Sequence, residues 1–208
     1  MTRFVFMILA AVGAVLADAA AAEGLKPADR EAVARAEAYL NEMHSLQSRF
    51  VQSSSNGEFA QGRLYLQRPK RLRLDYDAPS ALQVYADGYW LIYVDTELEE
   101  VTHVPLDRTP AGFLVRKTVS LSDGVRVTKV ERTDHRLFIH VVQADEPESG
   151  TVILSFDPDL LRLREWTVVD AQGIRTLVAL IAPTFNAPIE RKVFDFDQEK
   201  FSGDRPGG

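Results

Sequence analysis

Short segments in which apolar and polar residues alternate fill most of this chain, and they constrain its fold more than any other feature. The segment 71–76 alternates most strictly, with Leu72, Leu74 and Tyr76 on one side and Arg71, Arg73 and Asp75 on the other. Side chains alternate between the two faces of a strand, so this segment predicts a strand with one apolar and one solvated face. Such a pattern is typical of an antiparallel sheet.

Similar segments recur at roughly ten-residue spacing, which favours a sandwich, a barrel or a curved sheet. Turn residues separate them, and the Asp87-Gly88 pair is typical of a hairpin. Strands are predicted over residues 63–68, 71–76, 82–86, 89–94, 125–131, 137–143, 151–156, 161–170, 174–181 and 193–196.

One amphipathic helix is predicted ahead of the strands, over residues 27–52. Pro27 suits a first helical turn, and Asp29 favours the positive end of a helix. Apolar residues recur there every three or four positions, at Val33, Ala36, Leu40, Met43, Leu46 and Phe50. A second apolar segment, 111–115, follows two prolines and is interpreted as a mobile flap or as one or two helical turns.

The N-terminal residues have the features of a secretory signal peptide over residues 1–22. Arg3 supplies a positive charge, residues 4–16 are apolar, and Ala20 and Ala22 have the small side chains of a cleavage site. The apolar stretch is short for a bilayer span, so cleavage is favoured over an uncleaved anchor. We therefore expect a periplasmic protein.

Composition narrows the function further. The chain has no cysteine, which excludes disulfides, thiolate metal sites and a lipid anchor on an N-terminal cysteine. It carries 24 basic and 30 acidic residues, a net charge of −6 that argues against a nucleic-acid partner. No linker divides the chain, so residues 23–208 are expected to form a single, monomeric domain.

No constellation of residues indicates catalysis or metal binding. The four histidines do not stand at metal-ligand spacing, and no nucleophile elbow, P-loop or dinucleotide fingerprint occurs. The acidic cluster 97–100 is interpreted as a solvated turn, and Asp157-Pro158-Asp159 as a hairpin turn rather than part of a calcium loop. An exported hydrolase would need a Ser/His/acid set, which cannot be assembled here, so we expect neither an enzyme nor a cofactor.

Several segments together resemble a known family. They are Phe50-Val51-Gln52, Gly62-x-Leu64-x-Leu66-x-Arg68-Pro69, Leu72-x-Leu74-x-Tyr76, Asp87-Gly88-x-x-Leu91-x-Tyr93 and Thr109-Pro110 with Phe113-Leu114. This series is similar to that of the LolA-type outer-membrane lipoprotein carriers. The resemblance is clearest over residues 36–120 and thins to a series of strands beyond them.

The resemblance implies a mostly β fold with helices: a single curved antiparallel sheet, or incomplete β-barrel, covered by a long N-terminal helix and a short helical lid. An apolar cavity between them would take the acyl chains of lipoproteins. An inner-membrane ABC-type release complex would supply this cargo, and an outer-membrane lipoprotein acceptor would receive it. Carried over by position, the cavity wall falls on Leu64, Leu66, Leu72, Leu74, Tyr76 and Val84, and the lid on Phe113, Leu114 and Val115.

The family's strand arginine falls on Arg68, which shares a strand face with Leu64 and Leu66. A buried arginine is costly unless it is paired, and its five donors can hold several backbone carbonyls. We therefore expect Arg68 to act as a latch by bonding lid carbonyls around 113–115. The alternatives are an arginine in water at the sheet rim and, for the whole chain, a relative that binds or senses another lipid or glycolipid.

Overall fold

One α-helix and one sheet of eleven antiparallel strands make up the part of the chain that the computed structural model describes, residues 24–106, 109 and 112–196. The signal peptide predicted over residues 1–22 lies outside these ranges. The elements are α1 (Pro27–Glu42), β1 (Ser45–Ser54), β2 (Phe59–Gln67), β3 (Arg71–Tyr76), β4 (Leu82–Ala86), β5 (Trp90–Asp95), β6 (Glu100–Pro105), η2 (Gly112–Val115), β7 (Val125–Arg132), β8 (Leu137–Gln143), η3 (Pro147–Ser149), β9 (Gly150–Phe156), β10 (Leu163–Asp170), β11 (Arg175–Phe185) and η4 (Arg191–Phe194).

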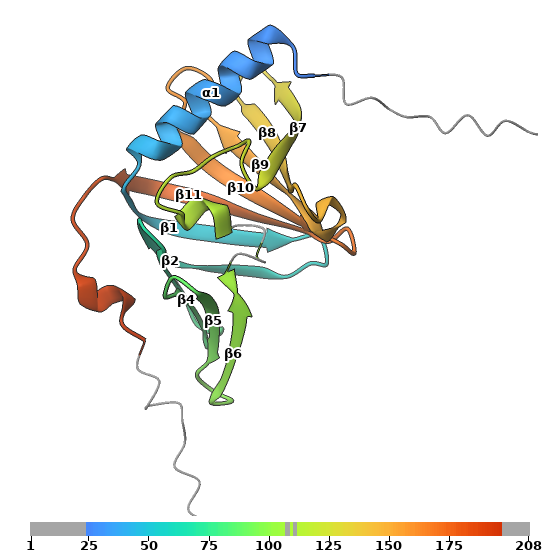
Figure 1. Ribbon diagram of the computed structural model, residues 1–208. Helices are drawn as coiled ribbons and strands as arrows, with labels where there is room; N and C mark the ends of the chain where they lie inside the picture. The colour runs from blue at the N-terminus through green and yellow to red at the C-terminus, as the bar shows by residue number, and fades with distance from the viewer. Residues whose placement is uncertain (1–23, 107–108, 110–111, 197–208) are drawn as a thin grey trace, which may run out of the picture.

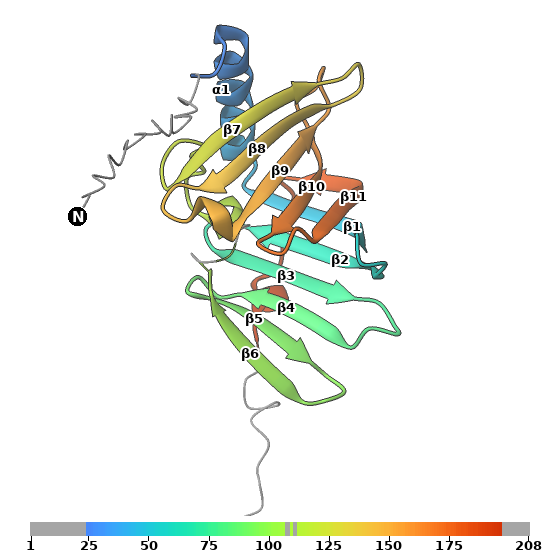
Figure 2. The same cartoon turned by 90° about the vertical axis from the view of Figure 1, so that its right-hand side faces the viewer.

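The sheet is open. Its spatial order is β6-β5-β4-β3-β2-β1-β11-β10-β9-β8-β7, so β6 and β7 form its two edges and β1 pairs with β11 near its middle. The chain builds one half outward to β6, crosses by way of η2, and returns from β7 to β11. Figures 1 and 2 show the sheet curving around one side, where α1 lies across the β7–β11 half and η2 lies beside it. A mostly β fold with one unclosed antiparallel sheet is therefore confirmed.

The main core lies on this concave face, beneath α1. Ala36 and Leu40 of the helix are fully buried, and the Tyr39 ring meets Phe156 and Phe185 edge to face, with centroids 6.1 and 6.2 Å apart. Aromatic pairs favour this geometry because the positive ring edge faces the negative ring face. Burial of apolar surface thus fixes α1 on the sheet.

The helix is shorter than predicted, because residues 45–54 form β1 and not its continuation. Leu46 and Phe50 are both buried, and residues four apart share a face in a helix and in a strand alike. The spacing of these two residues was therefore compatible with either structure. Pairing with β2 on one side and β11 on the other favours the strand.

The predicted last strand, 193–196, is also wrong. Residues 191–194 form the short 3-10 helix η4, which lies on the face of the sheet opposite to Leu72 and Leu74. Arg73, on the β3 face predicted to be solvated, donates to the Val193 carbonyl at 2.9 Å and lies over the Tyr85 ring. Tyr85 in turn meets Phe196, with ring centroids 5.4 Å apart. The C-terminal segment therefore covers part of the face that we expected to be wet.

The remaining predicted strands are present, with bounds that shift by a few residues, and β6 joins them as a strand that was not predicted. Strands β3, β4 and β8 have the predicted bounds. No α-helix in the described ranges combines the length and the apolar character needed to cross a bilayer.

Candidate functional site

The residues predicted to form a cavity wall gather on the concave face of β2, β3 and β4. Leu64 pairs with Leu74, and Leu74 pairs with Val84 on its other side, which places the three side chains in one row across the sheet. All three are buried, as is Leu66, whereas Leu72 and Tyr76 are partly buried. Alternation along β2 and β3 grouped Leu64 with Leu66, and Leu72 with Leu74 and Tyr76, on the faces that they occupy, whereas Val84 was assigned by the resemblance alone.

The η2 segment closes over this row. Phe113, Leu114 and Val115, the three residues predicted as a lid, are buried in the same apolar cluster as the wall residues. Downstream of η2, Asn41 of α1 donates to the Val119 carbonyl and accepts from the Val119 amide, each at 2.8 Å. The chain that follows η2 is therefore tied to the helix.

An apolar cavity of about 40 Å³ remains between η2 and the sheet. We refer to it as the apolar cavity; it is lined by Met43, Leu46, Leu64, Leu66, Leu72, Leu114, Val115, Leu163 and Trp166. Five of these residues were predicted for the wall or the lid. Met43, Leu46, Leu163 and Trp166 were not, because they come from the end of α1, from the strand mistaken for helix, and from β10.

Arg68 lies in the turn between β2 and β3 and is half-buried. Its Nε donates to the Leu114 carbonyl at 2.8 Å, and its Nη1 donates to the carbonyls of Leu40 and, at 2.9 Å, Met43. The side chain therefore joins η2 to the end of α1. The bond to η2 lies within the predicted range 113–115, whereas the two bonds to α1 were not foreseen.

Burial sets the electrostatics of this arginine. It lowers the pKa of Arg68 to about 10, which leaves the guanidinium charged at neutral pH. The third nitrogen, Nη2, is buried and has no hydrogen-bond partner among the described residues. A buried donor without a partner costs free energy, so the charge is held in a site that satisfies it only in part.

The same turn makes a second contact with η2. The backbone amide of Lys70 donates to the Val115 carbonyl at 2.6 Å. Two adjacent carbonyls of η2 thus accept hydrogen bonds from residues 68 and 70, one from a side chain and one from the main chain. Removal of the Arg68 side chain would leave the second bond in place.

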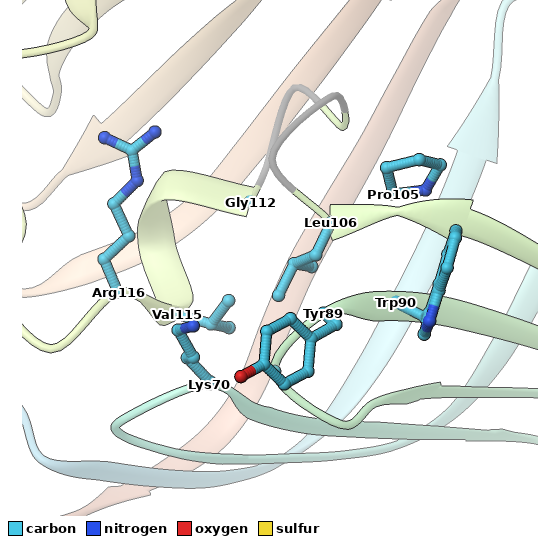
Figure 3. Close-up of a pocket in the computed structure, with 9 residues that line it drawn as sticks. Lys70, Tyr89, Trp90, Pro105, Leu106, Gly112, Val115 and Arg116 are labelled. Atoms are coloured by element: carbon cyan, nitrogen blue, oxygen red, sulfur yellow. The ribbon is translucent and has the colours of Figure 1, made fainter.

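A larger hollow of about 530 Å³ lies on the outer side of η2. Figure 3 shows the residues that line it, which come from the β2–β3 and β4–β5 turns, the start of β5, the end of β6 and η2, with one residue following β6 and one following η2. We call it the Tyr89 groove; its residues are Lys70, Gly88, Tyr89, Trp90, Pro105, Leu106, Gly112, Val115 and Arg116. None of them was predicted for this groove, because the β4–β5 turn was read only as a hairpin signal.

Within the described ranges, no group of three histidine, aspartate or glutamate side chains is close enough together to hold a metal ion. The polar chemistry of the site is that of a cation bonded to main-chain carbonyls. The protein thus has an unclosed antiparallel sheet, with a helix and a short segment over its apolar face. This arrangement places it in a class of proteins that enclose an apolar interior.

Comparison with known proteins identifies the family within that class. Residues 41–197 match the family described as "Outer membrane lipoprotein carrier protein LolA". The chain belongs to this family, which confirms the resemblance found in the sequence.

Relatives agree with this assignment, and a solved structure shares the fold. The chain is 28% identical over 204 residues to an outer-membrane lipoprotein carrier protein of Pseudomonas aeruginosa, with 94% of this chain and 93% of the relative covered. A relative of the same description from Azotobacter vinelandii is 27% identical, with 88% of this chain and 92% of the relative covered. The crystal structure of a DUF1329 family protein from Desulfovibrio piger has the same fold, with a TM-score of 0.50, 10% identity, and coverage of 81% and 96%.

Proposed function

We propose that this protein is a periplasmic carrier that binds the acyl chains of lipoproteins beneath η2 and shuttles them from the inner to the outer membrane. One observation carries the proposal: the half-buried Arg68 is bonded to a carbonyl of η2, and η2 forms the outer wall of an apolar cavity. The names of the relatives support lipoproteins as the cargo. An inner-membrane ABC-type release complex as donor and an outer-membrane acceptor complete the proposed route.

We interpret the described conformation as the closed, empty one. A cavity of about 40 Å³ has room for about one water molecule, whereas an acyl chain needs a far larger space. Cargo must therefore displace η2, which acts as a lid and opens the row of Leu64, Leu74 and Val84. The chain after the lid is tied to α1 through Asn41, so the lid would swing on that tether.

Release is the harder step for a carrier. Burying about sixteen methylenes at about 0.8 kcal/mol each stabilises a loaded state by roughly 13 kcal/mol. A closed empty state must compete with this term, because the periplasm supplies no ATP. Hydrogen bonds to a charged group contribute about 1.5–3 kcal/mol each, so the three bonds of Arg68 offset part of the acyl burial when they re-form.

The test is a two-step transfer assay with Arg68→Leu. This variant lacks the latch and gains apolar wall, so it should accept lipoprotein from the donor complex but pass it to the acceptor at least about tenfold more slowly. Loaded carrier should then accumulate in the soluble fraction. Each step is measured separately, with purified donor and acceptor.

Arg71→Leu is the matched control, because Arg71 lies three residues further on and its side chain bonds only Gln67 Oε1 in the described part of the chain, at 3.4 Å. It should load and release like the unaltered protein. Normal release by Arg68→Leu, or a folded Arg68→Leu protein that cannot load, would contradict the latch.

A further inference from the structure

The Tyr89 groove and the apolar cavity share a wall. Val115 lines both of them, on opposite sides of η2, and Leu114 beside it bonds Arg68. A molecule whose chains lie beneath η2 could therefore place its polar end in the groove without leaving the same short segment of backbone. Because the two spaces share Val115, a single lipid could occupy both of them. The position of the groove on the surface would not by itself indicate a lipid.

The charge of the groove is opposite to that of the chain. Lys70 and Arg116 line it, no described lining residue is acidic, and the whole chain carries a net charge of −6. Within the described ranges Lys70 forms no ion pair, and its Nζ lies 5.0 Å from the centroid of the Tyr89 ring. The Arg116 guanidinium points away from Lys70 and Tyr89 and donates to the Asp123 carbonyl (Figure 3). A cation without a carboxylate partner, beside an aromatic ring, favours an anionic ligand.

Aromatic side chains at the rim indicate an amphipathic ligand rather than a simple ion. Tyr89 is 78% exposed and Trp90 is 42% exposed, and Figure 3 shows the Tyr89 hydroxyl directed toward Lys70. Tyrosine and tryptophan are favoured where one end of a site is apolar and the other is wet. A volume of about 530 Å³ is in the range of small-molecule sites.

We infer that the Tyr89 groove binds the phosphate-bearing head of a diacyl phospholipid whose chains enter the apolar cavity, which makes free anionic phospholipid a second ligand of this carrier. The inference rests on the proposed function, because the chains use the same cavity. Lys70 supplies the charge, and Tyr89 covers the glycerol region. Phospholipid bound in this way competes with lipoprotein for the apolar cavity beneath η2.

The experiment compares two lipids with identical acyl chains, phosphatidylglycerol and diacylglycerol, as competitors of an apolar fluorescent probe on the full carrier. Phosphatidylglycerol should displace the probe at about fivefold lower concentration, since a partly exposed charge contact is modest. Lys70→Gln should abolish most of this preference, and 0.5 M salt should weaken it. Arg126→Gln, which removes an exposed cation from β7 at the other edge of the sheet, should leave the preference unchanged.

Glycerol 3-phosphate, which has the head but no chains, is the third competitor and should fail to displace the probe. If it competes as well as the phospholipid, the groove is a site for free phosphate and the lipid assignment is overturned. Equal displacement by the two diacyl lipids, unchanged by Lys70→Gln, also overturns the inference but leaves the proposed carrier function intact. If neither diacyl lipid displaces the probe, the proposed function itself fails.

Discussion

The two halves of the sheet use the same antiparallel pairing but are covered in different ways. Under α1, residues such as Ile139, Leu154 and Phe156 have no exposed surface. Across the middle of the sheet, Tyr93 lies on the same strand face as Leu91 and is 36% exposed. Apolar contact along a sixteen-residue helix covers one half, whereas four residues of η2 cover part of the other.

The way each cover is attached differs as well. Side-chain burial along about four turns holds α1, together with an ion pair between Asp29 and Arg132. η2 buries only Phe113, Leu114 and Val115 beyond its single glycine. Hydrogen bonds from Arg68 and Lys70 add to this burial, and Asn41 holds the chain that follows. Water can replace each of these hydrogen bonds when the segment moves. We therefore expect stability to reside mainly in the helix-covered half, and the proposed lid movement to occur in the half beneath η2.

The largest expected effect comes from cutting one leucine in each half. Leu154→Ala leaves a cavity in a fully buried position and should lower the free energy of unfolding by about 2–5 kcal/mol. Leu72→Ala, at a partly buried position that lines the apolar cavity, should lower it by about 1 kcal/mol. Urea denaturation of both variants measures the difference, and equal losses would remove the distinction between the halves.

A smaller effect is expected at the tether between η2 and the helix. Asn41→Ala removes both bonds to Val119 and should lower stability by about 1–2 kcal/mol. Native-state hydrogen exchange should show faster exchange of amides in 112–121, with β8 and β9 unchanged. Asn56→Ala, in the β1–β2 turn, is the control that should leave these amides alone. A uniform rise across the sheet would mean that the two halves open together.

The smallest effect appears only at alkaline pH. Burial raises the pKa of Tyr76 from 10.0 to about 12, and its hydroxyl bonds Gln52 Oε1 at 2.8 Å. A tyrosine whose pKa is higher in the folded state stabilises that state below about pH 10, and this stability is lost as the pH rises toward 12. Tyr76→Phe should therefore lose about 1 kcal/mol less than the unaltered protein over this interval. Parallel pH curves of unfolding free energy would place Tyr76 in a wetter site.

Sequence alone predicted the correct elements wherever the spacing of apolar residues fitted only one type of secondary structure. Strict alternation in 71–76 specified the strand and the face of each residue, because a one-residue slip would turn every leucine to water. The sequence pattern gave the wrong structure at 45–54, because Leu46 and Phe50 are four residues apart, a spacing that fits one face of a helix and one face of a strand. Only the partners of that segment, β2 and β11, decide between them, and pairing at long range leaves no local signal.

The candidate site divides in the same way. Alternation placed Arg68 on the apolar face, and its five donors predicted carbonyl partners. The carbonyls of Leu40 and Met43 were not predicted as partners, because the sequence pattern extended the helix to residue 52, whereas it ends at Glu42. The Tyr89 groove was missed because its residues come from turns, strand ends and η2, which are separated along the chain. From sequence, a turn residue such as Gly88 indicates only the backbone conformation of its own turn. The surface that several turns form together cannot be predicted in this way.

The unclosed edge between β6 and β7 has a consequence for the range of cargo. In a closed barrel, the number of strands and their stagger set the radius, so the interior has one size. Here the width of the interior depends on the angle between the two halves of the sheet, which meet at β1 and β11. No ladder of hydrogen bonds between β6 and β7 fixes this angle. We therefore expect a single sequence of this fold to enclose slender or bulky molecules through small changes in sheet curvature, and substitutions in loops and edges to alter the capacity of the interior without rebuilding the core.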